Sequence, residues 1–382
     1  MAMPPETPLL NPNTIVLVTG GSGGLASQIL HLFSQQGSQN LHSIDLRQPS
    51  HHLNNVTYHV GDLTDSTSMH LIFQAAKPNI VIHTASPKFD SANHVMHKVN
   101  IEGTKTLLQI AKECGTRAFV YTSSASVISD ATTDLENADE SYPVNLNAQQ
   151  PEFYTYTKAV AETYVLSQNC RAQGTRVLSC AIRPSGIFGV GDLVVLPGIL
   201  DAFDRGQTRV QIGDNKNLFD FTANINVAHA HYLAAVALDT CQTGDLPGDD
   251  EKVDGEAFFI TNDEPRCFWD FTRLVWGYAG DKTQPGQVWV ITRTWALLLA
   301  GVVEWVFWGL RMGEPPLTRT KVRLSCMTRC FCVDKAKKRL GYRPLVGLEE
   351  GLKQAVEDCV RRRLMGRSVA QVDGSGGKEK GQ

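Results

Sequence analysis

The chain has 382 residues, a formal net charge of −3 at pH 7, 42% hydrophobic residues and 20% charged residues. This length is enough for one large or two modest domains with a substantial core. The ordinary composition excludes a disordered chain, collagen and a long coiled coil. The near-neutral charge gives the molecule as a whole no field that would attract nucleic acid, so we expect no nucleic-acid partner.

The nine cysteines are odd in number and have no regular paired spacing, so we expect reduced thiols. Cys326, Cys330 and Cys332 lie close together, but no second cluster of ligands accompanies them, and we predict no metal site. The first residues lack the charged and apolar regions of a secretory signal. We therefore expect a flexible N-terminus over residues 1–13 and synthesis in the cytosol.

From Thr14 onward, short β-branched runs alternate with longer helical patterns. The runs that predict strands are TIVLVTG, LHSIDL, VTYHVGD, NIVIHTAS, RAFVYTSS and RVLSCAIRP. The segments that predict helices are 25–37, 66–76, 99–114 and 153–171. The alternation predicts an α/β fold with a doubly wound parallel Rossmann sheet over residues 14–189, whose strands are buried on both faces.

After about Gly189 the alternation breaks into segments punctuated by Gly and Asp. We interpret residues 190–365 as a smaller C-terminal substrate-binding lobe, with a return to the first domain near 219–238. Such a lobe would lie over the carboxyl ends of the strands, where ligands bind in open α/β sheets. From Gly366 the chain shows no apolar periodicity, which predicts a disordered tail over 366–382.

A glycine-rich turn joins the first predicted strand to the first predicted helix. Gly20, Gly23 and Ala26 follow a G-x-x-G-x-x-A spacing, which lets the backbone approach a pyrophosphate at the helix N-terminus. Such a turn alone also occurs in ordinary loops. Its position between a strand and a helix favours a dinucleotide site.

Two acidic residues follow the next two strands. Asp45 ends the second strand, where a carboxylate can accept hydrogen bonds from adenosine ribose hydroxyls and repel a 2′-phosphate, which favours NAD. Arg47 would instead accept the phosphate of NADP, so NADP stays open. The structural alternatives are a strand-end turn residue for Asp45 and a helix N-cap for Asp62.

Tyr154 and Lys158 lie four residues apart at the start of a predicted helix, so their side chains share one face. Oxidation of a secondary alcohol needs a base that takes the hydroxyl proton as hydride leaves the carbon. A phenol of pKa ~10 must be acidified by about 3 units, or about 4 kcal/mol, to act near pH 7. A lysine ammonium ~4 Å away supplies a similar energy at an effective dielectric of ~20. Ser124, at the end of a predicted strand, would hydrogen-bond the same substrate oxygen.

The same spacing recurs at Tyr278 and Lys282, inside a Gly/Asp turn. Spacing alone is therefore not diagnostic, because a helix-start tyrosine can simply pack on the aliphatic stem of a lysine. The order of glycine-rich turn, serine-containing strand and Tyr–Lys helix favours Tyr154 over Tyr278.

Longer motifs accompany these residues: VTGGSGGLA, GDLTD, HTASP, VNIEGT, VYTSSASVI, YTYTKAVAE, RPSGIFGVGD, QIGDNKNLFDFT, FFITNDEP and AKKRLGYRPLVGLEEGL. On these motifs, from about residue 14 to 360, the chain resembles the extended short-chain dehydrogenases/reductases. Within them it resembles the 3β-hydroxysteroid dehydrogenase branch, and there the decarboxylating enzymes of sterol 4α-carboxylates.

The resemblance implies NAD(P)-dependent oxidation of a sterol 3β-hydroxyl, with loss of a C4 carboxyl in sterol C4 demethylation. It implies Tyr154 as proton acceptor, Lys158 as its activator and a ribose contact, and Ser124 as donor to the substrate oxygen. It also implies a set of NAD contacts, namely Gly20, Ser22, Gly23, Gly24, Leu25, Asp45 and Asp62. A homodimer is compatible with the sequence.

Two other interpretations stay open. A related enzyme would oxidise the 3β-hydroxyl of a fungal triterpenoid or meroterpenoid without decarboxylation, because the residues do not reveal whether the substrate carries a carboxylate. A protein of another class, a Rossmann regulator that senses NAD(P), would bind the dinucleotide without turnover. Intact Ser124, Tyr154 and Lys158 disfavour the regulator, which has no use for a polarised phenol.

A strongly apolar segment lies in the predicted lobe. From Trp295 to Leu310, 13 of 16 residues are apolar, and four of the six tryptophans lie in or beside this segment. As a helix it would be about 24 Å long, shorter than the ~30 Å hydrocarbon core. Ten Lys/Arg against two acidic residues follow from Arg311 to Arg343, a local +8.

We therefore predict that 288–343 attaches the protein, as a peripheral or monotopic protein, to the cytosolic face of the endoplasmic reticulum membrane. The alternative is a buried helix in an apolar substrate lobe.

Overall fold

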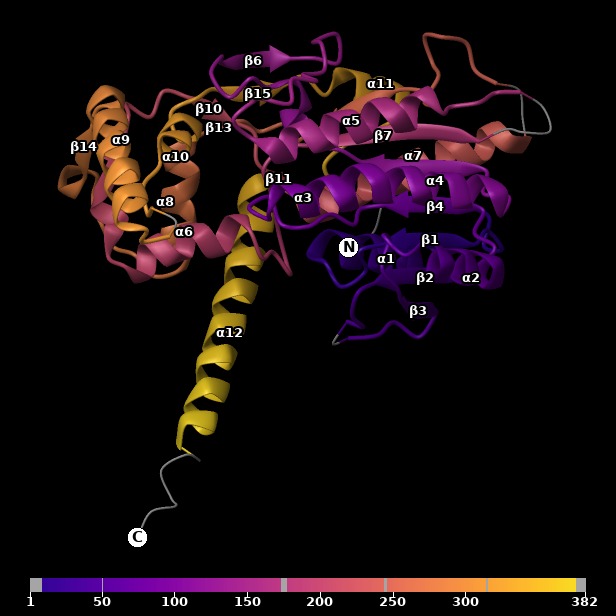
Figure 1. Cartoon of the computed structure of the whole chain (residues 1–382), viewed down its shortest axis with the longest axis horizontal. Helices are drawn as coiled ribbons and strands as arrows, with labels where there is room; N and C mark the ends of the chain where they lie inside the picture. Colours follow the sequence, from indigo (N-terminus) through magenta and orange to yellow (C-terminus); the bar gives the residue numbers. More distant parts are fainter. Residues whose placement is uncertain (1–8, 50, 173–176, 244–245, 314, 376–382) are drawn as a thin grey trace.

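The computed structural model describes residues 9–49, 51–172, 177–243, 246–313 and 315–375. A seven-stranded parallel sheet forms the centre of one half of the molecule (Figure 1), in the order β12-β7-β5-β4-β1-β2-β3. Its strands are β1 (Val16–Thr19), β2 (Leu41–Asp45), β3 (Val56–Val60), β4 (Ile80–His83), β5 (Ala118–Thr122), β7 (Leu178–Pro184) and β12 (Ala257–Ile260). The predicted doubly wound parallel sheet is confirmed.

Helices cover both faces of this sheet. On one face lie α1 (Gly24–Gln35) and α7 (Asn224–Thr243), which contact each other through the edge-on ring pair Phe33 and Tyr232, 5.0 Å apart. The other face carries α2 (Ser66–Ala76), α4 (Thr104–Glu113) and α5 (Phe153–Ser167). The helical segment that ends in α4 begins earlier than predicted, with α3 (Asn93–Met96) and a π-helical stretch at His97–Gly103.

The chain passes back and forth between the two halves. The lobe is built on a four-stranded sheet of order β13-β10-β15-β6. Its strands are β13 (Arg266–Cys267), β10 (Leu218–Phe219), β15 (Arg329–Phe331) and β6 (Leu135–Ala138). β6 comes from the segment predicted as the Rossmann domain, whereas β12, the edge strand of the large sheet, comes from the segment predicted as the lobe. Sequence periodicity did not reveal either exchange.

In the described part of the chain, five helices and two short strand pairs complete the lobe. The helices are α6 (Val195–Asp204), α8 (Phe268–Tyr278), α9 (Arg293–Leu310), α10 (Arg319–Leu324) and α12 (Leu348–Ser375). The strand pairs are β8 (Ile187–Phe188) with β11 (Thr222–Ala223), and β9 (Val210–Ile212) with β14 (Trp289–Ile291). The aromatic core of the lobe is centred on Phe221 and Phe271, whose rings stack with centroids 3.5 Å apart.

The prediction of a disordered tail from Gly366 requires correction. Helix α12 continues to Ser375, past Gly366, where a disordered tail was predicted, because each residue added to an established helix gains a backbone hydrogen bond. The second half of α12 projects away from the rest of the molecule (Figure 1). Residues 376–382 lie outside the described part of the chain, as do residues 1–8 of the predicted flexible N-terminus.

The basic run from Arg311 to Arg343 does not form one patch. In Figure 1, α9 and α10 lie at the left edge, whereas α11 (Asp334–Leu340) lies above the large sheet. Lys335 and Lys337 of α11 pair with Glu256 and Asp263 at 2.6 and 2.8 Å. The cations beside α9 are thus a smaller group, Arg293, Arg311, Arg319, Lys321 and Arg323, of which Arg319 pairs with Glu304 of α9 at 2.7 Å.

A buried carboxyl group joins two strands of the lobe sheet. Asp220, directly after β10, accepts a hydrogen bond from the Phe331 backbone N–H at 2.8 Å and is 2% exposed. Burial raises the pKa of Asp220 to about 7, with a further rise from the nearby Asp263 and an opposing effect of the Phe331 hydrogen bond. Asp220 is therefore a site where proton binding and folding are coupled.

Replacement of Asp220 by Asn should make stability less dependent on pH. Because the folded-state pKa is raised, the folded wild-type protein holds a proton that the unfolded chain releases, and it loses stability as the pH rises toward about 7. From pH 5.5 to 8.5, we expect Asp220→Asn to gain about 2 kcal/mol relative to wild type. Urea unfolding at both pH values measures this difference. If the difference in unfolding free energy between Asp220→Asn and wild type is the same at pH 5.5 and 8.5, the raised pKa of Asp220 is contradicted.

Candidate active site

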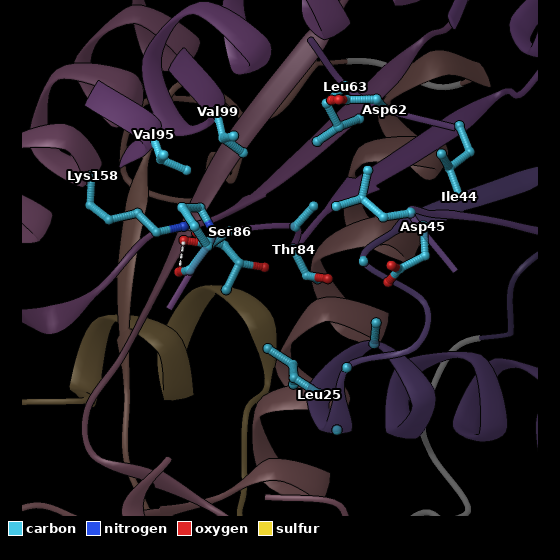
Figure 2. A pocket seen from close by; sticks show the side chains of 18 of the residues that line it. Leu25, Ile44, Asp45, Asp62, Leu63, Thr84, Ser86, Val95, Val99 and Lys158 are labelled. Atoms are coloured by element: carbon cyan, nitrogen blue, oxygen red, sulfur yellow. Dashed lines mark hydrogen bonds between the residues drawn. The ribbon is translucent and has the colours of Figure 1, made fainter. Parts of the chain in front are cut away.

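A cavity of about 460 Å³ opens at the carboxyl ends of β1, β2, β4 and β5, where the strand order of the sheet reverses. Open α/β sheets bind ligands at this point. In Figure 2, Asp45 and Ile44 lie at one side of the pocket, and Lys158 and Ser86 at the other. The predicted site residues that line this cavity are Gly20, Gly23, Gly24, Leu25, Asp45, Asp62, Tyr154 and Lys158.

The glycine-rich turn fits a dinucleotide pyrophosphate. Gly20 has a φ of +78°, and a Cβ there would lie 3.0 Å from the Ala85 Cα, so the turn needs glycine. Helix α1 begins at Gly24 without a side-chain cap and without an acidic residue in its first turn. Its first backbone N–H groups therefore remain available to an anion.

Ser22 makes hydrogen bonds at the end of β2. Its backbone N–H donates to Asp45 Oδ2 at 2.9 Å, and its hydroxyl donates to the Arg47 carbonyl at 2.8 Å. Ser22 is not among the described residues that line the cavity. It therefore orients Asp45, while Asp45 itself faces the pocket where a ribose would lie. The Arg47 side chain is exposed.

Asp62 lines the cavity but does not cap the following helix. Asp65 is the N-cap of α2, where its side chain accepts from the Thr67 and Ser68 N–H groups. Asp62 instead accepts from the Thr64 N–H at 2.8 Å in the preceding turn. The structural alternative for Asp62 is thus wrong, and its carboxylate faces the pocket.

Helix α5 brings Tyr154 and Lys158 to the same cavity. The Lys158 ammonium donates to the Thr122 carbonyl at 2.8 Å and lies 5.0 Å from the Tyr121 ring centroid. Burial lowers the pKa of Lys158 to about 7, while Glu162 acts in the opposite direction. The amine is therefore close to its titration point at neutral pH.

The expected acidification of Tyr154 by Lys158 is not present in the protein alone. Burial raises the pKa of Tyr154 to about 12, and the negative charge of Glu152 adds to the rise. A hydrogen bond between the hydroxyl groups of Ser86 and Tyr154 opposes the rise. The expectation considered only the charge of Lys158, but removal of the phenolate from water has the larger effect here.

Ser124 lies in a second cavity of about 470 Å³ that adjoins the first. Tyr154, Ser123 and Ser86 line both cavities, so the two spaces meet at the phenol. The Ser124 hydroxyl bonds that of Ser126 at 2.8 Å. The Ser123 hydroxyl is buried and, within the described residues, has no hydrogen-bond partner, so it offers a hydrogen bond to a ligand.

Sequence reasoning from spacing missed a polar chain behind the phenol. The Ser86 hydroxyl donates to Asn100 Oδ1 at 3.0 Å, and the Asn100 amide donates to the Thr157 hydroxyl at 3.0 Å. Thr157 in turn donates to the Tyr154 carbonyl at 2.7 Å. Ser86 and Asn100 lie in the motifs HTASP and VNIEGT, which were noted only for their resemblance. These contacts fix the helix turn that carries Tyr154.

The second Tyr–Lys pair lies elsewhere. Tyr278 ends α8 in the lobe, is 38% exposed and is not among the described residues lining either cavity. Among the described residues, no group of three His, Cys, Asp or Glu side chains has the geometry to hold a metal ion.

Comparisons with known proteins agree with this site. The profile described as "3-beta hydroxysteroid dehydrogenase/isomerase family" matches residues 17–291. The chain is 38% identical to the sterol-4-alpha-carboxylate 3-dehydrogenase, decarboxylating, of Saccharomyces cerevisiae, over 89% of this chain and 96% of that protein. It is 33% identical to the human protein of that name, over 89% and 87% of the two chains.

Solved structures show the same fold. The crystal structure of gox2253 matches with a TM-score of 0.68 at 25% identity, over 92% of this chain and 99% of that chain. The UDP-glucose 4-epimerase of Thermotoga maritima matches with a TM-score of 0.66 at 21% identity, over 92% and 100%.

Replacement of Asp45 by Ala should change the choice of dinucleotide. The variant loses a carboxylate that repels a 2′-phosphate, and it frees the Ser22 N–H as a phosphate donor. We expect the ratio of NADP to NAD affinity to rise about tenfold or more. Fluorescence titration with each dinucleotide measures this ratio. Asp65→Asn, which alters the N-cap of α2, is the control and should leave it unchanged. An unchanged ratio in Asp45→Ala would show that Asp45 does not contact the ribose.

Proposed function

The chain belongs to the 3-beta hydroxysteroid dehydrogenase/isomerase family, and from this premise we propose that it oxidises the 3β-hydroxyl of a sterol 4α-carboxylate with NAD(P). The product is the decarboxylated 3-ketone, a step in sterol C4 demethylation. The observation that carries the proposal is the position of Tyr154, where the dinucleotide cavity with Lys158 meets the second cavity with Ser124.

The residues divide the chemistry between them. Tyr154 takes the proton of the substrate hydroxyl, and Ser124 hydrogen-bonds the same oxygen. When bound, oxidised NAD(P) supplies the hydride acceptor and a positive charge that favours the phenolate. Lys158 would contact the ribose, and its positive charge would favour the phenolate of Tyr154. The pyrophosphate would be held by the turn that contains Gly20, Gly23 and Gly24.

The loss of the carboxyl group needs no further catalytic side chain. Oxidation of a 3β-hydroxyl next to a C4 carboxylate gives a β-keto acid, which releases carbon dioxide through its enol. The hydrogen bonds that Tyr154 and Ser124 make to the C3 oxygen also stabilise this enol. Asp45 at the ribose end supports NAD as the dinucleotide.

The exposed face of α9 supports attachment to a membrane. This 18-residue helix is the one among the described residues that is long and apolar enough to cross a membrane, and only 11% of it is buried. Trp295, Trp305 and Trp308 are 69–77% exposed, and nearby Trp289 is 78% exposed. This exposure supports attachment to a membrane over the alternative of a buried lobe helix.

With the cations of α9 and α10, this face combines apolar insertion and attraction to anionic lipid. We propose that the helix lies in the cytosolic face of a membrane, that of the endoplasmic reticulum, from which a sterol substrate would come.

The central experiment compares a 4α-carboxysterol with its uncarboxylated analogue. We expect wild-type protein and NAD to give reduced nicotinamide and the decarboxylated 3-ketone from the first substrate, identified by mass spectrometry. Tyr154→Phe should reduce turnover about 10²–10⁴-fold, because the proton acceptor is lost. Its affinity for NAD should stay within about twofold of wild type, because the phenol is not needed to bind the dinucleotide.

Tyr278→Phe is the matched control, since it alters the Tyr–Lys pair outside the cavities, and it should turn over like wild type. Activity retained in Tyr154→Phe would overturn the mechanism. Binding of NAD without turnover of either sterol would favour a dinucleotide sensor, and oxidation without release of carbon dioxide would favour the triterpenoid-type alternative.

The membrane proposal predicts that charges on the exposed face of α9 abolish lipid binding. In Val302→Glu/Trp305→Glu, each replaced side chain should cost about tenfold or more in affinity, because 1.5–3 kcal/mol of apolar burial is lost. Co-sedimentation with phosphatidylcholine vesicles containing phosphatidylinositol measures binding. Leu71→Glu, an equally exposed position on α2, is the control. Equal sedimentation of the α9 variant and wild type would disprove the attachment.

A further inference from the structure

A short loop lies against the dinucleotide turn. Loop 189–192 follows β8 and leads through Leu193 and Val194 to α6, and its Gly191 contacts Gly24 at the N-terminus of α1. A Cβ on Gly24 would lie 2.7 Å from the Gly191 carbonyl oxygen, and a Cβ on Gly191 would lie 3.1 Å from the Gly24 Cα. The two backbones are therefore in direct contact. Any displacement of the loop changes what covers the first turn of α1.

The same loop forms part of the second cavity. Gly191 and Asp192 line it, as do Leu193 and Val194, which are 59% and 45% exposed although apolar. Gly24 lines both cavities. The loop thus has one surface on the dinucleotide turn and another on the space where Ser124 and Tyr154 face the substrate.

Side chains from two distant helices hold the loop. From α12, Asp358 accepts the Gly191 N–H at 3.0 Å, and Arg362 donates to the Asp192 carbonyl at 2.9 Å. From α7, Asn224 donates to the Val190 carbonyl at 2.8 Å. Arg362 also donates to Asp358 at 2.8 Å, so the two α12 side chains act as one unit.

The charge of Asp358 is secured in this arrangement. Its side chain is 9% exposed, and burial alone would raise its pKa. The hydrogen bonds from Gly191, Arg361 and Arg362 outweigh that effect and hold the pKa of Asp358 below its ordinary value. The carboxylate is therefore ionised at neutral pH, and its charge is balanced by the guanidinium groups of Arg361 and Arg362.

We propose that Asp358 and Arg362 are positioning residues that press loop 189–192 against Gly24 and thereby couple dinucleotide binding to substrate binding. The identity of the two ligands rests on the proposed function. In the held position the loop covers the dinucleotide turn and presents Leu193 and Val194 to the substrate cavity. Release of the loop would weaken both ligands while leaving Tyr154, Lys158 and Ser124 in place.

The test compares Asp358→Ala and Arg362→Gln with two matched controls. Arg361→Gln removes a partner of the same carboxylate, but among the described residues Arg361 makes no hydrogen bond to the loop. Arg363→Gln removes an anchor of α12 to Asp201, Asp204 and the Pro197 carbonyl of α6, and leaves the loop contacts intact. Arg361→Gln shows the effect of removing a partner of Asp358 that does not bond the loop. Arg363→Gln shows the effect of loosening α12 without a change in the loop contacts.

The readouts are the Kd for NAD from fluorescence quenching, amide hydrogen exchange of peptides over 189–195, and steady-state kinetics. In Asp358→Ala we expect the Kd for NAD to rise about tenfold, as for loss of one charge-assisted hydrogen bond. Exchange in the loop should be faster, and KM for NAD and sterol should rise while kcat stays within about threefold. Arg362→Gln should act in the same direction. Arg363→Gln should match wild type in all three readouts, and Arg361→Gln, which leaves the Gly191 and Asp192 contacts in place, should change them less than Arg362→Gln does.

Asp358→Asn separates the hydrogen bond from the charge. Its amide oxygen can still accept the Gly191 N–H, so it should restore part of the affinity that Asp358→Ala loses. The proposal is overturned if Asp358→Ala and Arg362→Gln lower the melting temperature but keep wild-type NAD affinity and loop exchange. If Asp358→Ala does not fold, Arg362→Gln decides alone. NAD affinity and loop exchange need no sterol, so a failure of sterol turnover would defeat the proposed function without affecting this test.

Discussion

The hydrogen bond from the buried Lys158 ammonium to the Thr122 carbonyl is the contact on which the site depends. It ties α5 to the end of β5, where the chain continues directly into Ser123 and Ser124. One bond therefore sets the distance between the helix that carries the phenol and the strand end that carries the serines. Burial of this amine lowers its pKa from 10.5 to about 7, which corresponds to about 5 kcal/mol against the charged form. The polar chain from Ser86 through Asn100 and Thr157 fixes the same helix turn from its other side.

Much of the large sheet could be predicted because a parallel α/β sheet is encoded locally. Most of its strands are short apolar or β-branched runs, and each helix has its own period, so β1 to β5 and α1, α2 and α5 were found close to their observed bounds. β6 and β12 were not assigned to their sheets. Both are four residues long, and their sheet is decided by which edge is free after the rest has folded.

The candidate site shows the same division between local and distant information. The spacing of Tyr154 and Lys158 predicts that they share a helix face, and both do line one cavity. It carries no information on burial, and burial decides the direction in which the pKa of Tyr154 moves. Likewise, the sequence correctly gives ten basic residues from Arg311 to Arg343, but not their positions in space. The chain turns back at α11, where Lys335 and Lys337 pair with Glu256 and Asp263 beside β12.

The exchange of β6 and β12 between the two halves has a consequence for how this protein folds and how it can be divided. A fragment cut after residue 189 would lack the edge strand β12 and the covering helix α7, and would expose the flank of β7 to other chains. Neither half is formed by one continuous segment of the chain. We therefore expect that neither half folds as a separately expressed domain. Unfolding should accordingly be a single cooperative transition of the whole molecule.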